Sequence, residues 1–253
     1  MNLIKSFNIN NKDIITIVGA GGKTSLMFSA SSLLRKNYKV LVTTTTNIYV
    51  PDEKLYDEMI MLSEIKDDNY KNIIEKSKNG VYIIGNYIEN KLGENKPKIK
   101  GLNSKILDEI SPYFDIVLIE GDGSKEKPLK GWKDDEPVIY NKSTKVIGVV
   151  DISSIGLEIN ENNIHRLDKF INIINDNKSQ KVILEHLKNL ALNKTGLFNG
   201  YKGEKILFIN KVEKSKNNQD ATLLIEKIKN ENHLYINRFI YGSIFNNEFS
   251  SKQ

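Results

Sequence analysis

The stretch ITIVGAGGKTSLMF, residues 15–28, decides the fold of this chain. An apolar run is followed by a glycine-rich turn and then by apolar residues at helical spacing, so the stretch predicts a strand, a loop and a helix. Two kinds of nucleotide site begin in this way. One is the dinucleotide fingerprint, in which the loop holds a pyrophosphate. The other is the phosphate loop, in which it holds a nucleoside triphosphate.

The dinucleotide fingerprint, G-x-G-x-x-G, is only partly present. Gly19 and Gly21 occupy its first two positions, but the third falls on Thr24. The third glycine lets the helix pack closely on the strand, and threonine is bulkier there. The second predicted strand ends in four threonines, residues 43–46, where an acid that holds the ribose is expected. A nicotinamide-linked oxidoreductase is therefore disfavoured.

The phosphate loop fits the same stretch better, because the helix begins with Gly-Lys-Thr, although the loop is two residues shorter than the common pattern. Backbone N–H groups at a helix N-terminus point at phosphate oxygens, and the helix dipole favours their charge. Lys23 is expected to reach the β- and γ-phosphates, and Thr24 to place its hydroxyl on Mg²⁺. A turn without a ligand is the alternative. The loop residues predicted to bind ATP or GTP are Gly19, Ala20, Gly21, Gly22, Lys23, Thr24 and Ser25.

An acidic pair follows a later apolar run, in DIVLIEGDGS, residues 115–124. Side chains alternate along a strand, so Glu120 and Asp122 are expected to point the same way at its end. In an open α/β sheet that end is where ligands bind. Either carboxylate can hold Mg²⁺ or orient an attacking water. An acidic turn that merely ends the strand is the alternative.

The third element is ILFINKVE, residues 206–213, an apolar strand that ends in polar residues. Asn210, Lys211 and Glu213 resemble the N-K-x-D motif of GTP-binding proteins, in which the acid accepts hydrogen bonds from guanine. Glutamate is one methylene longer than aspartate, which weakens the prediction of guanine specificity. The motif indicates contact with a nucleobase, and a polar strand end remains the alternative.

Three further stretches carry groups that suit a substrate or an anion. The threonine run includes Thr44 and Thr45, the cationic stretch GDGSKEKPLKG (121–131) includes Ser124 and Lys130, and NIHRLD (163–168) includes His165 and Arg166. A loop this cationic can hold a second anion or balance charge on a transferred phosphoryl group. Ordinary strand threonines, a solvated lysine loop and a polar helix start explain the same residues equally well.

The composition excludes several classes of protein. The chain has 253 residues and no cysteine, which excludes disulfides and thiolate chemistry. His165, His186 and His233 match no zinc motif. The net charge is +5, but the basic residues are scattered among acidic ones, so no nucleic-acid groove is expected. No signal peptide or apolar run of about 18 residues is present, so we expect a cytoplasmic protein without a membrane partner.

Short, continuous apolar runs predict strands that are covered on both faces. We expect an α/β fold of the P-loop NTPase type, with a mostly parallel central sheet flanked by helices. It forms a single domain over residues 1–253, with a small helical insertion at about 160–195. The predicted strands are 14–18, 40–44, 81–84, 116–119, 146–150, 206–209 and, more weakly, 239–240; the predicted helices outside the insertion are 24–36, 70–77, 104–110 and 221–230.

Several stretches together resemble the YqeC family, whose members are regarded as accessory proteins of selenium-dependent molybdenum hydroxylases. They are VGAGGKTS, VLVTTTTNIYVP, IEGDGSKEKPLKGW, EPVIY, VIGVVDISSIGLEINENNIHR and FINKVE, in this order. This chain has Gly121 where the family's acidic motif has alanine, and Glu213 where the family has aspartate. The resemblance implies a nucleotide-binding protein that helps to mature such an enzyme, with the hydroxylase or its cofactor-maturation proteins as partners.

The residues predict Mg²⁺-dependent binding of a nucleoside triphosphate, followed by hydrolysis or phosphoryl transfer. Lys23, Glu120 and Asp122 are the predicted catalytic residues, and Thr24, Glu120 and Asp122 the predicted metal ligands. One alternative is a kinase or ATP-dependent ligase that acts on a cofactor precursor. Another is a scaffold that carries the nucleotide without catalysis.

Overall fold

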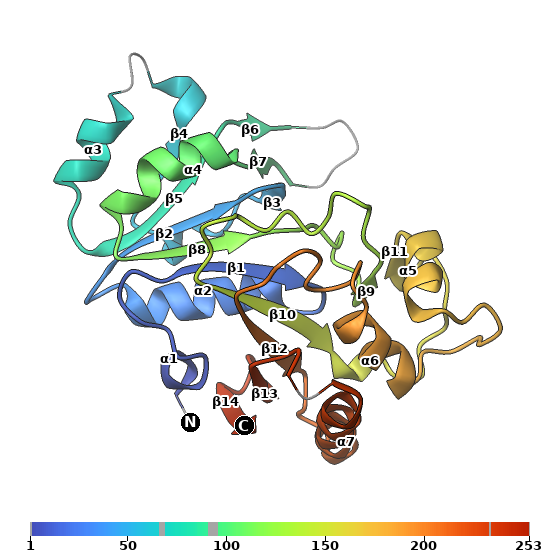
Figure 1. The fold of residues 1–253 in the computed structure, drawn as a ribbon. Helices are drawn as coiled ribbons and strands as arrows, with labels where there is room; N and C mark the ends of the chain where they lie inside the picture. The colour runs from blue at the N-terminus through green and yellow to red at the C-terminus, as the bar shows by residue number, and fades with distance from the viewer. Residues whose placement is uncertain (1, 66–68, 91–95, 233, 253) are drawn as a thin grey trace.

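A nine-stranded sheet forms the centre of the molecule in the computed structural model, which describes residues 2–65, 69–90, 96–232 and 234–252 (Figure 1). Every pairing in this sheet is parallel except the last, between β13 and β14. The mostly parallel α/β fold predicted from the sequence is thus confirmed. In spatial order the strands are β14 (Glu248–Lys252), β13 (Arg238–Ser243), β12 (Glu204–Asn210), β10 (Lys145–Asp151), β1 (Ile14–Gly19), β8 (Ile116–Glu120), β2 (Lys39–Thr44), β5 (Gly80–Gly85) and β4 (Glu58–Met61).

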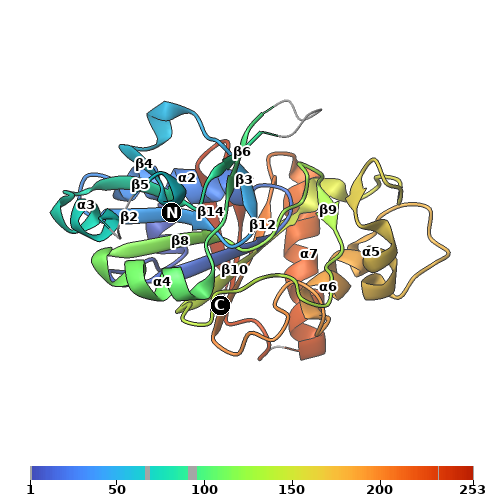
Figure 2. The ribbon, with the colours of Figure 1, turned by 90° about the horizontal axis from the view of Figure 1, so that it is seen from above.

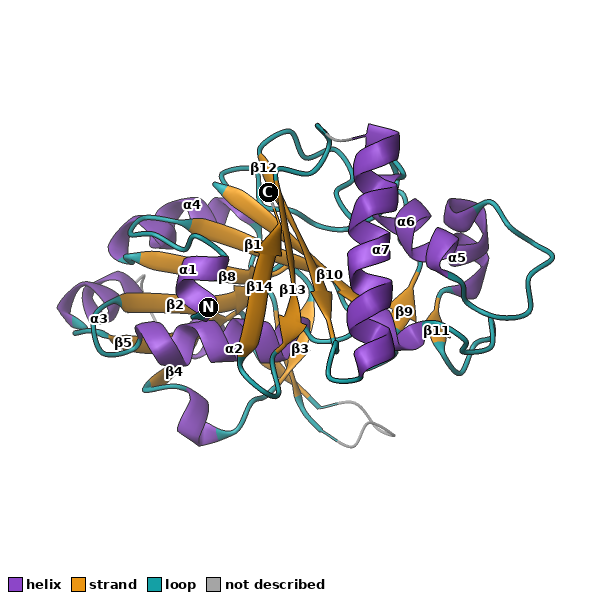
Figure 3. Cartoon of the chain, turned by 90° about the horizontal axis from the view of Figure 1, so that it is seen from below, coloured by secondary structure: helices purple, strands orange, loops and turns teal. Residues whose placement is uncertain are grey.

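Helices cover both faces of the sheet (Figure 3). One face packs on α1 (Leu3–Ser6) and α2 (Lys23–Leu34), where Ile15 and Ile17 of β1 are buried. On the other face, α3 (Tyr70–Lys76) and α4 (Ser104–Ile110) cover one half of the sheet. The remaining half packs on α5 (Leu167–Ile174), α6 (Leu184–Leu192) and α7 (Ser215–Asn232).

Two short strands and a helix lie at one end of the molecule, beyond α7 (Figures 2 and 3). The strands β9 (Leu129–Lys130) and β11 (Ile164–His165) pair in parallel, and α5 follows β11 directly. Both α5 and α6 fall within the range 160–195 that was predicted as a helical insertion. Lys130 of β9 contacts Asp122 and Gly123, which follow β8, and Asp122 bonds to Gly19 at the end of β1, so this part meets the central sheet there.

All seven predicted strands are present, and the two other strands of the nine-stranded sheet lie at its edges. β4 and β14 expose part of their length, so neither has the continuous apolar pattern of a central strand. A separate small sheet contains β3 (Asn47–Tyr49), β7 (Lys98–Lys100) and β6 (Ile88–Glu89), and the single-turn 3₁₀ helices are Glu53–Leu55, Leu62–Glu64, Ser111–Tyr113 and Ile152–Ser154. None of the described helices combines the length and apolar character that a membrane crossing requires.

The direction of the chain reverses around β1. After β1 the chain continues through α2 to β2, on one side, whereas after β10 it continues to β12 and β13, on the other. Loops on the two sides of such a point diverge and leave a crevice at the carboxyl ends of the strands, where ligands bind in open α/β sheets. The glycine-rich loop after β1 lies at this crevice.

Candidate functional site

The glycine-rich loop has a shape that only glycine permits. Gly21 has φ of +84°, and a Cβ at this position would lie 2.3 Å from the Cβ of Asp151. Gly22 has φ of +139°, and its Cβ would lie 2.4 Å from Nδ2 of Asn210. L-residues rarely adopt these backbone conformations, so a side chain at either position would strain the loop in addition to these close contacts. The sequence thus fixes a tight loop between the ends of β10 and β12.

The loop and the start of α2 present a row of free backbone donors. The N–H of Ala20 bonds to the carbonyl of Val149, and that of Leu26 to the carbonyl of Gly22. Among the described hydrogen bonds, the five N–H groups between them, residues 21–25, have no acceptor. Four such groups are left at any helix start, where the dipole favours an anion. The row here is longer, because the loop residue Gly21 precedes the N-cap Gly22 and its N–H also has no described acceptor.

Lys23, the first residue of α2, is buried and folds back over the loop. Its Nζ donates to the carbonyl oxygen of Gly19 at 2.7 Å. The same ammonium lies 3.5 Å from Oδ1 of Asp122 and 3.7 Å from Oε1 of Glu120. The lysine and both predicted carboxylates therefore meet beside the loop.

Thr24 and Glu120 form a direct pair. The Thr24 hydroxyl donates to Oε2 of Glu120 at 2.7 Å. Glu120 is the last residue of β8 and is buried, and this burial raises the pKa of its carboxyl despite the nearby Lys23 charge and the Thr24 hydrogen bond. The nearby Asp122 charge also raises this pKa. A hydroxyl and a carboxylate next to a row of N–H groups are the oxygen ligands that suit Mg²⁺ beside a phosphate.

Asp122 is fully buried, and protein donors surround its carboxylate. Gly19 donates its backbone N–H to both oxygens, at 3.0 and 3.1 Å, and Trp132 donates Nε1 to Oδ2 at 2.6 Å. The ammonium of Lys130 lies 3.0 Å from Oδ2. Burial opposes ionisation, but the charges of Lys130 and Lys23 outweigh it, so the pKa of Asp122 is lowered. This carboxylate anchors the base of the loop.

A chain of alternating charges continues from Asp122 toward β11. Lys130 of β9 is fully buried, donates to the carbonyl of Gly123 at 2.7 Å and lies 3.6 Å from Oε2 of Glu136. Burial lowers the pKa of Lys130, although the charges of Asp122 and Glu136 oppose this effect. Arg166 then binds Glu136 with both terminal guanidinium nitrogens, one of them at 2.8 Å from Oε1. Arg166 was predicted to contact an anion, and the structure places it on an internal carboxylate.

The other residues that were predicted to contact a substrate or an anion have different surroundings. The hydroxyls of Thr44 and Thr45 donate to the carbonyls of Glu120 and Val138, both at 2.8 Å. His165 lies opposite Lys130 in the β9–β11 pair. Burial and then the charges of Arg166, Lys130, Lys125 and Lys127 lower the pKa of His165 to about 4, so its imidazole is neutral at pH 7. Ser124 is half-buried in the loop between β8 and β9. His233 lies outside the described residues.

The Asn-Lys-Val-Glu segment reaches the same loop. Asn210 donates Nδ2 to the carbonyl of Gly21 at 2.8 Å, and the Lys211 ammonium pairs with the buried carboxylate of Asp151. Glu213 is exposed and accepts a hydrogen bond from the hydroxyl of Ser243. Asn210 and Lys211 thus brace the loop, while Glu213 is tied to the end of β13.

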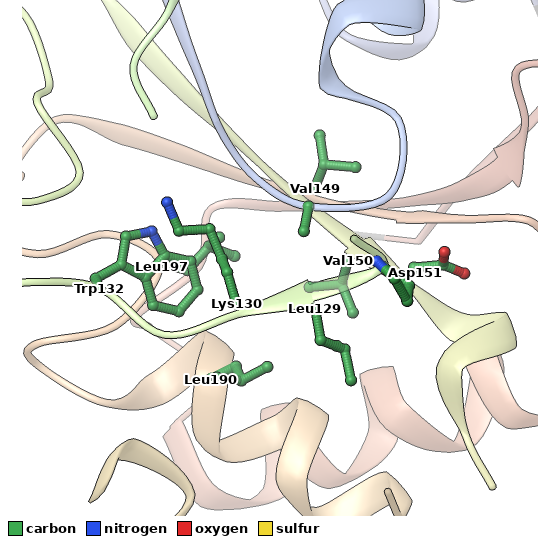
Figure 4. A pocket seen from close by; sticks show the side chains of 10 residues that line it. Leu129, Lys130, Trp132, Val149, Val150, Asp151, Leu190 and Leu197 are labelled. Atoms are coloured by element: carbon green, nitrogen blue, oxygen red, sulfur yellow. The ribbon is translucent and has the colours of Figure 1, made fainter. Parts of the chain in front are cut away.

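Three residues of the site were missed by the sequence reasoning. Asp151, Trp132 and Glu136 all contact predicted site residues. Only Asp151 had a local signal, an acid at the end of the apolar run 146–150. Figure 4 shows Lys130 and Trp132 on one side of a cavity and Asp151 on the other. The cavity has a volume of about 10 Å³, near the minimum for a single water, and the rest of its lining is apolar, from the glycine-rich loop, β9, β10, α6 and the segments beside them.

A magnesium ion fits this site only with help from a ligand. Among the described residues, no group of three or more histidines, cysteines or acids is arranged to hold a metal. Thr24 and Glu120 supply two protein oxygens, and Asp122 is enclosed by donors. Mg²⁺ commonly binds in this way, through one or two protein groups, phosphates and water.

The fold and the loop define the chain as an α/β protein with a glycine-rich strand–loop–helix turn at the carboxyl edge of its sheet. The family model described as YqeC protein matches residues 15–168, more than half of the chain. A relative in Escherichia coli (strain K12), described as "Uncharacterized protein YqeC", is 28% identical over 219 residues, covering 81% of this chain and 78% of the relative. No solved structure matches. The chain belongs to the YqeC family, as its motifs predicted.

Proposed function

We propose that this protein binds a nucleoside triphosphate with Mg²⁺ and hydrolyses it or transfers its phosphoryl group. The observation that carries the proposal is the row of five N–H groups at residues 21–25, none with a described protein acceptor, next to Lys23. Such a row at a helix start is suited to phosphate oxygens. ATP and GTP are the expected nucleotides, because Asn210 of the Asn-Lys-Val-Glu segment bonds to the same loop and Glu213 follows it three residues further along the chain.

Lys23 is proposed to exchange partners when the nucleotide binds. In the structure its ammonium is held by the Gly19 carbonyl and two carboxylates. A triphosphate carries more negative charge than the neutral Gly19 carbonyl, so the ammonium would leave this carbonyl for a phosphate oxygen. Asp122 would remain bound to Gly19 and Lys130, which keeps the loop in position during this exchange.

Thr24 and Glu120 are proposed to hold the metal. When bound, Mg²⁺ would neutralise part of the charge on the phosphate oxygens. The carboxyl of Glu120 has a raised pKa, because it is buried, so in the metal-free site it accepts a proton more readily than an exposed glutamate. The same residue is therefore a candidate to orient or deprotonate an attacking water or hydroxyl group.

The family resemblance supports a wider role in the maturation of a selenium-dependent molybdenum hydroxylase. In this proposal the second substrate is a cofactor precursor or the partner protein itself. Only when this acceptor is present would a kinase release ADP, or a ligase release ADP with phosphate or AMP with diphosphate. A hydrolase would release phosphate without it, and a scaffold would release none.

A binding titration tests the proposal. Wild type, Lys23→Ala and the control Lys36→Ala, an exposed lysine just after α2, are titrated with ATP, GTP and NAD, with and without Mg²⁺. We expect wild type and the control to bind the triphosphates and Lys23→Ala to lose at least tenfold in affinity, while NAD binds to none. A ligand that binds only the folded state raises the melting temperature, so thermal shifts give a second readout. Absence of triphosphate binding by a folded wild type would overturn the proposal.

A further inference from the structure

Phe245 lies in the turn between β13 and β14 and is 93% exposed, the most exposed of the large apolar side chains in the described part of the chain. A phenyl ring in water contributes nothing to the core, since apolar side chains stabilise a fold by burial. The turn itself would be satisfied by a polar residue. The exposed ring is therefore available to contact a ligand, and its place relative to the candidate site decides which one.

Hydrogen bonds fix the turn to the Asn-Lys-Val-Glu segment. The backbone N–H of Ile244 donates to Oδ1 of Asn210 at 3.3 Å, and the hydroxyl of Ser243 donates to Glu213. The N–H of Asn246 closes the turn on the Ser243 hydroxyl at 3.0 Å. Asn210 and Glu213 thus hold the two residues before Phe245, and the Ser243 hydroxyl holds the residue after it.

The same turn lies next to the glycine-rich loop. Asn210 also donates to the carbonyl of Gly21 at 2.8 Å, so one amide connects the loop and the turn. A Cβ on Gly22 would lie 3.3 Å from Cδ1 of Ile244. Phe245 is therefore one residue away from a side chain that contacts the proposed phosphate-binding loop.

We propose that Phe245 stacks on the base of the bound nucleotide and that Glu213 accepts hydrogen bonds from the edge of that base. This inference rests on the proposed function, because the phosphates must lie at residues 21–25. The base then extends from the loop toward the ends of β12 and β13, where the ring and the carboxylate lie. Every nucleobase has an aromatic face, so stacking favours nucleotides over bare phosphate without choosing among bases.

A nucleobase fits the surroundings of this ring better than a protein surface does. The residues that follow it, Asn246, Asn247 and Glu248, are polar and exposed. A stable protein interface buries about 800 Å² on each partner around several apolar residues. One isolated ring with polar neighbours does not provide that area, whereas it matches a single base.

The test compares nucleotides with tripolyphosphate, which has the phosphates and no base. Wild type, Phe245→Ala, Phe245→Trp and the control Leu223→Ala are titrated calorimetrically with ATP, GTP and tripolyphosphate in Mg²⁺. Leu223 is an exposed apolar residue on α7. The melting temperature of each variant shows that it is folded, and sedimentation gives its oligomeric state.

We expect Phe245→Ala to weaken ATP and GTP about 5- to 150-fold, which corresponds to ~1–3 kcal/mol, and to leave tripolyphosphate within about twofold. Phe245→Trp and Leu223→Ala should bind all three compounds as wild type does, within about threefold. Equal nucleotide affinities in wild type and Phe245→Ala would overturn the stacking while leaving the phosphate site intact. So would an oligomer that dissociates in Phe245→Ala with unchanged nucleotide binding. If wild type binds neither tripolyphosphate nor nucleotide, the proposed function fails as well.

Discussion

Replacing Asp122 with asparagine tests whether the buried charges beside the loop hold it in place. The substitution keeps the shape and an acceptor for the Gly19 N–H, but it removes the negative charge between Lys23 and Lys130. Lys130 is fully buried and would keep the Gly123 carbonyl and, as its described carboxylate partner, Glu136 at 3.6 Å. Breaking a buried ion pair on one side costs about 3–5 kcal/mol. At about 2–4 °C per kcal/mol for a chain of this size, the melting temperature should fall by roughly 6–20 °C.

Urea and thermal unfolding would measure this loss in Asp122→Asn, in the double variant Asp122→Asn/Lys130→Met and in the control Asp52→Asn. The double variant removes the stranded ammonium, so it should recover at least half of the lost stability. Asp52 is an exposed partner of Lys54, and its replacement should leave the midpoint unchanged. A loss below about 1 kcal/mol in Asp122→Asn, or no recovery in the double variant, would refute the reasoning.

Three further predictions concern the same site. Burial raises the folded-state pKa of Glu120, so this residue lowers the stability of the fold as the pH rises from its unfolded-state pKa through the folded value. Glu120→Gln should therefore melt no lower than wild type at pH 7 and should lose most phosphate release, and retained turnover would contradict this. Conversely, the lowered pKa of Asp122 adds stability above about pH 4, and this stability is lost as the pH falls through the folded-state pKa. Asp122→Asn should therefore show a weaker loss of stability on acidification than wild type, and equal slopes of stability against pH in the two proteins would count against it. ATP and GTP should differ by less than about 100-fold in affinity, and Glu213→Asp should sharpen the preference for GTP, because the longer glutamate misplaces its carboxylate. Competition titrations measure both affinities, and a thousandfold weaker binding of ATP than of GTP by wild type would refute this prediction.

The sequence predicted those parts of the fold and of the site whose signal lies within one short stretch of residues. Gly22, Lys23 and Thr24 follow one another at a strand end, so their pattern predicted the loop and the helix that begins there. The continuous apolar runs predicted every central strand, because strands covered on both faces have no polar alternation. Glu120 was predicted for the same reason, since it ends such a run.

The remaining features of the site depend on contacts between residues that are far apart in the sequence, which no local pattern reveals. Alternation placed Glu120 and Asp122 on one side of the strand end, but it did not reveal that Trp132 and Lys130 enclose the second carboxylate. Arg166 bonds to Glu136, thirty residues earlier, and nothing in either local stretch indicates that pairing. The edge strands β4 and β14 were missed because partial exposure gives them a mixed pattern.

The central claim is that the N–H groups of residues 21–25 bind the phosphates of a nucleotide. Amide proton NMR during a titration with Mg²⁺–ATP measures this most directly, because each N–H reports its own hydrogen bond. The amides of Gly21, Gly22, Lys23, Thr24 and Ser25 are expected to shift more than those elsewhere and to exchange more slowly with solvent, and Lys23→Ala should reduce both effects. If saturating Mg²⁺–ATP leaves these five amides unchanged, the phosphates do not bind at the loop.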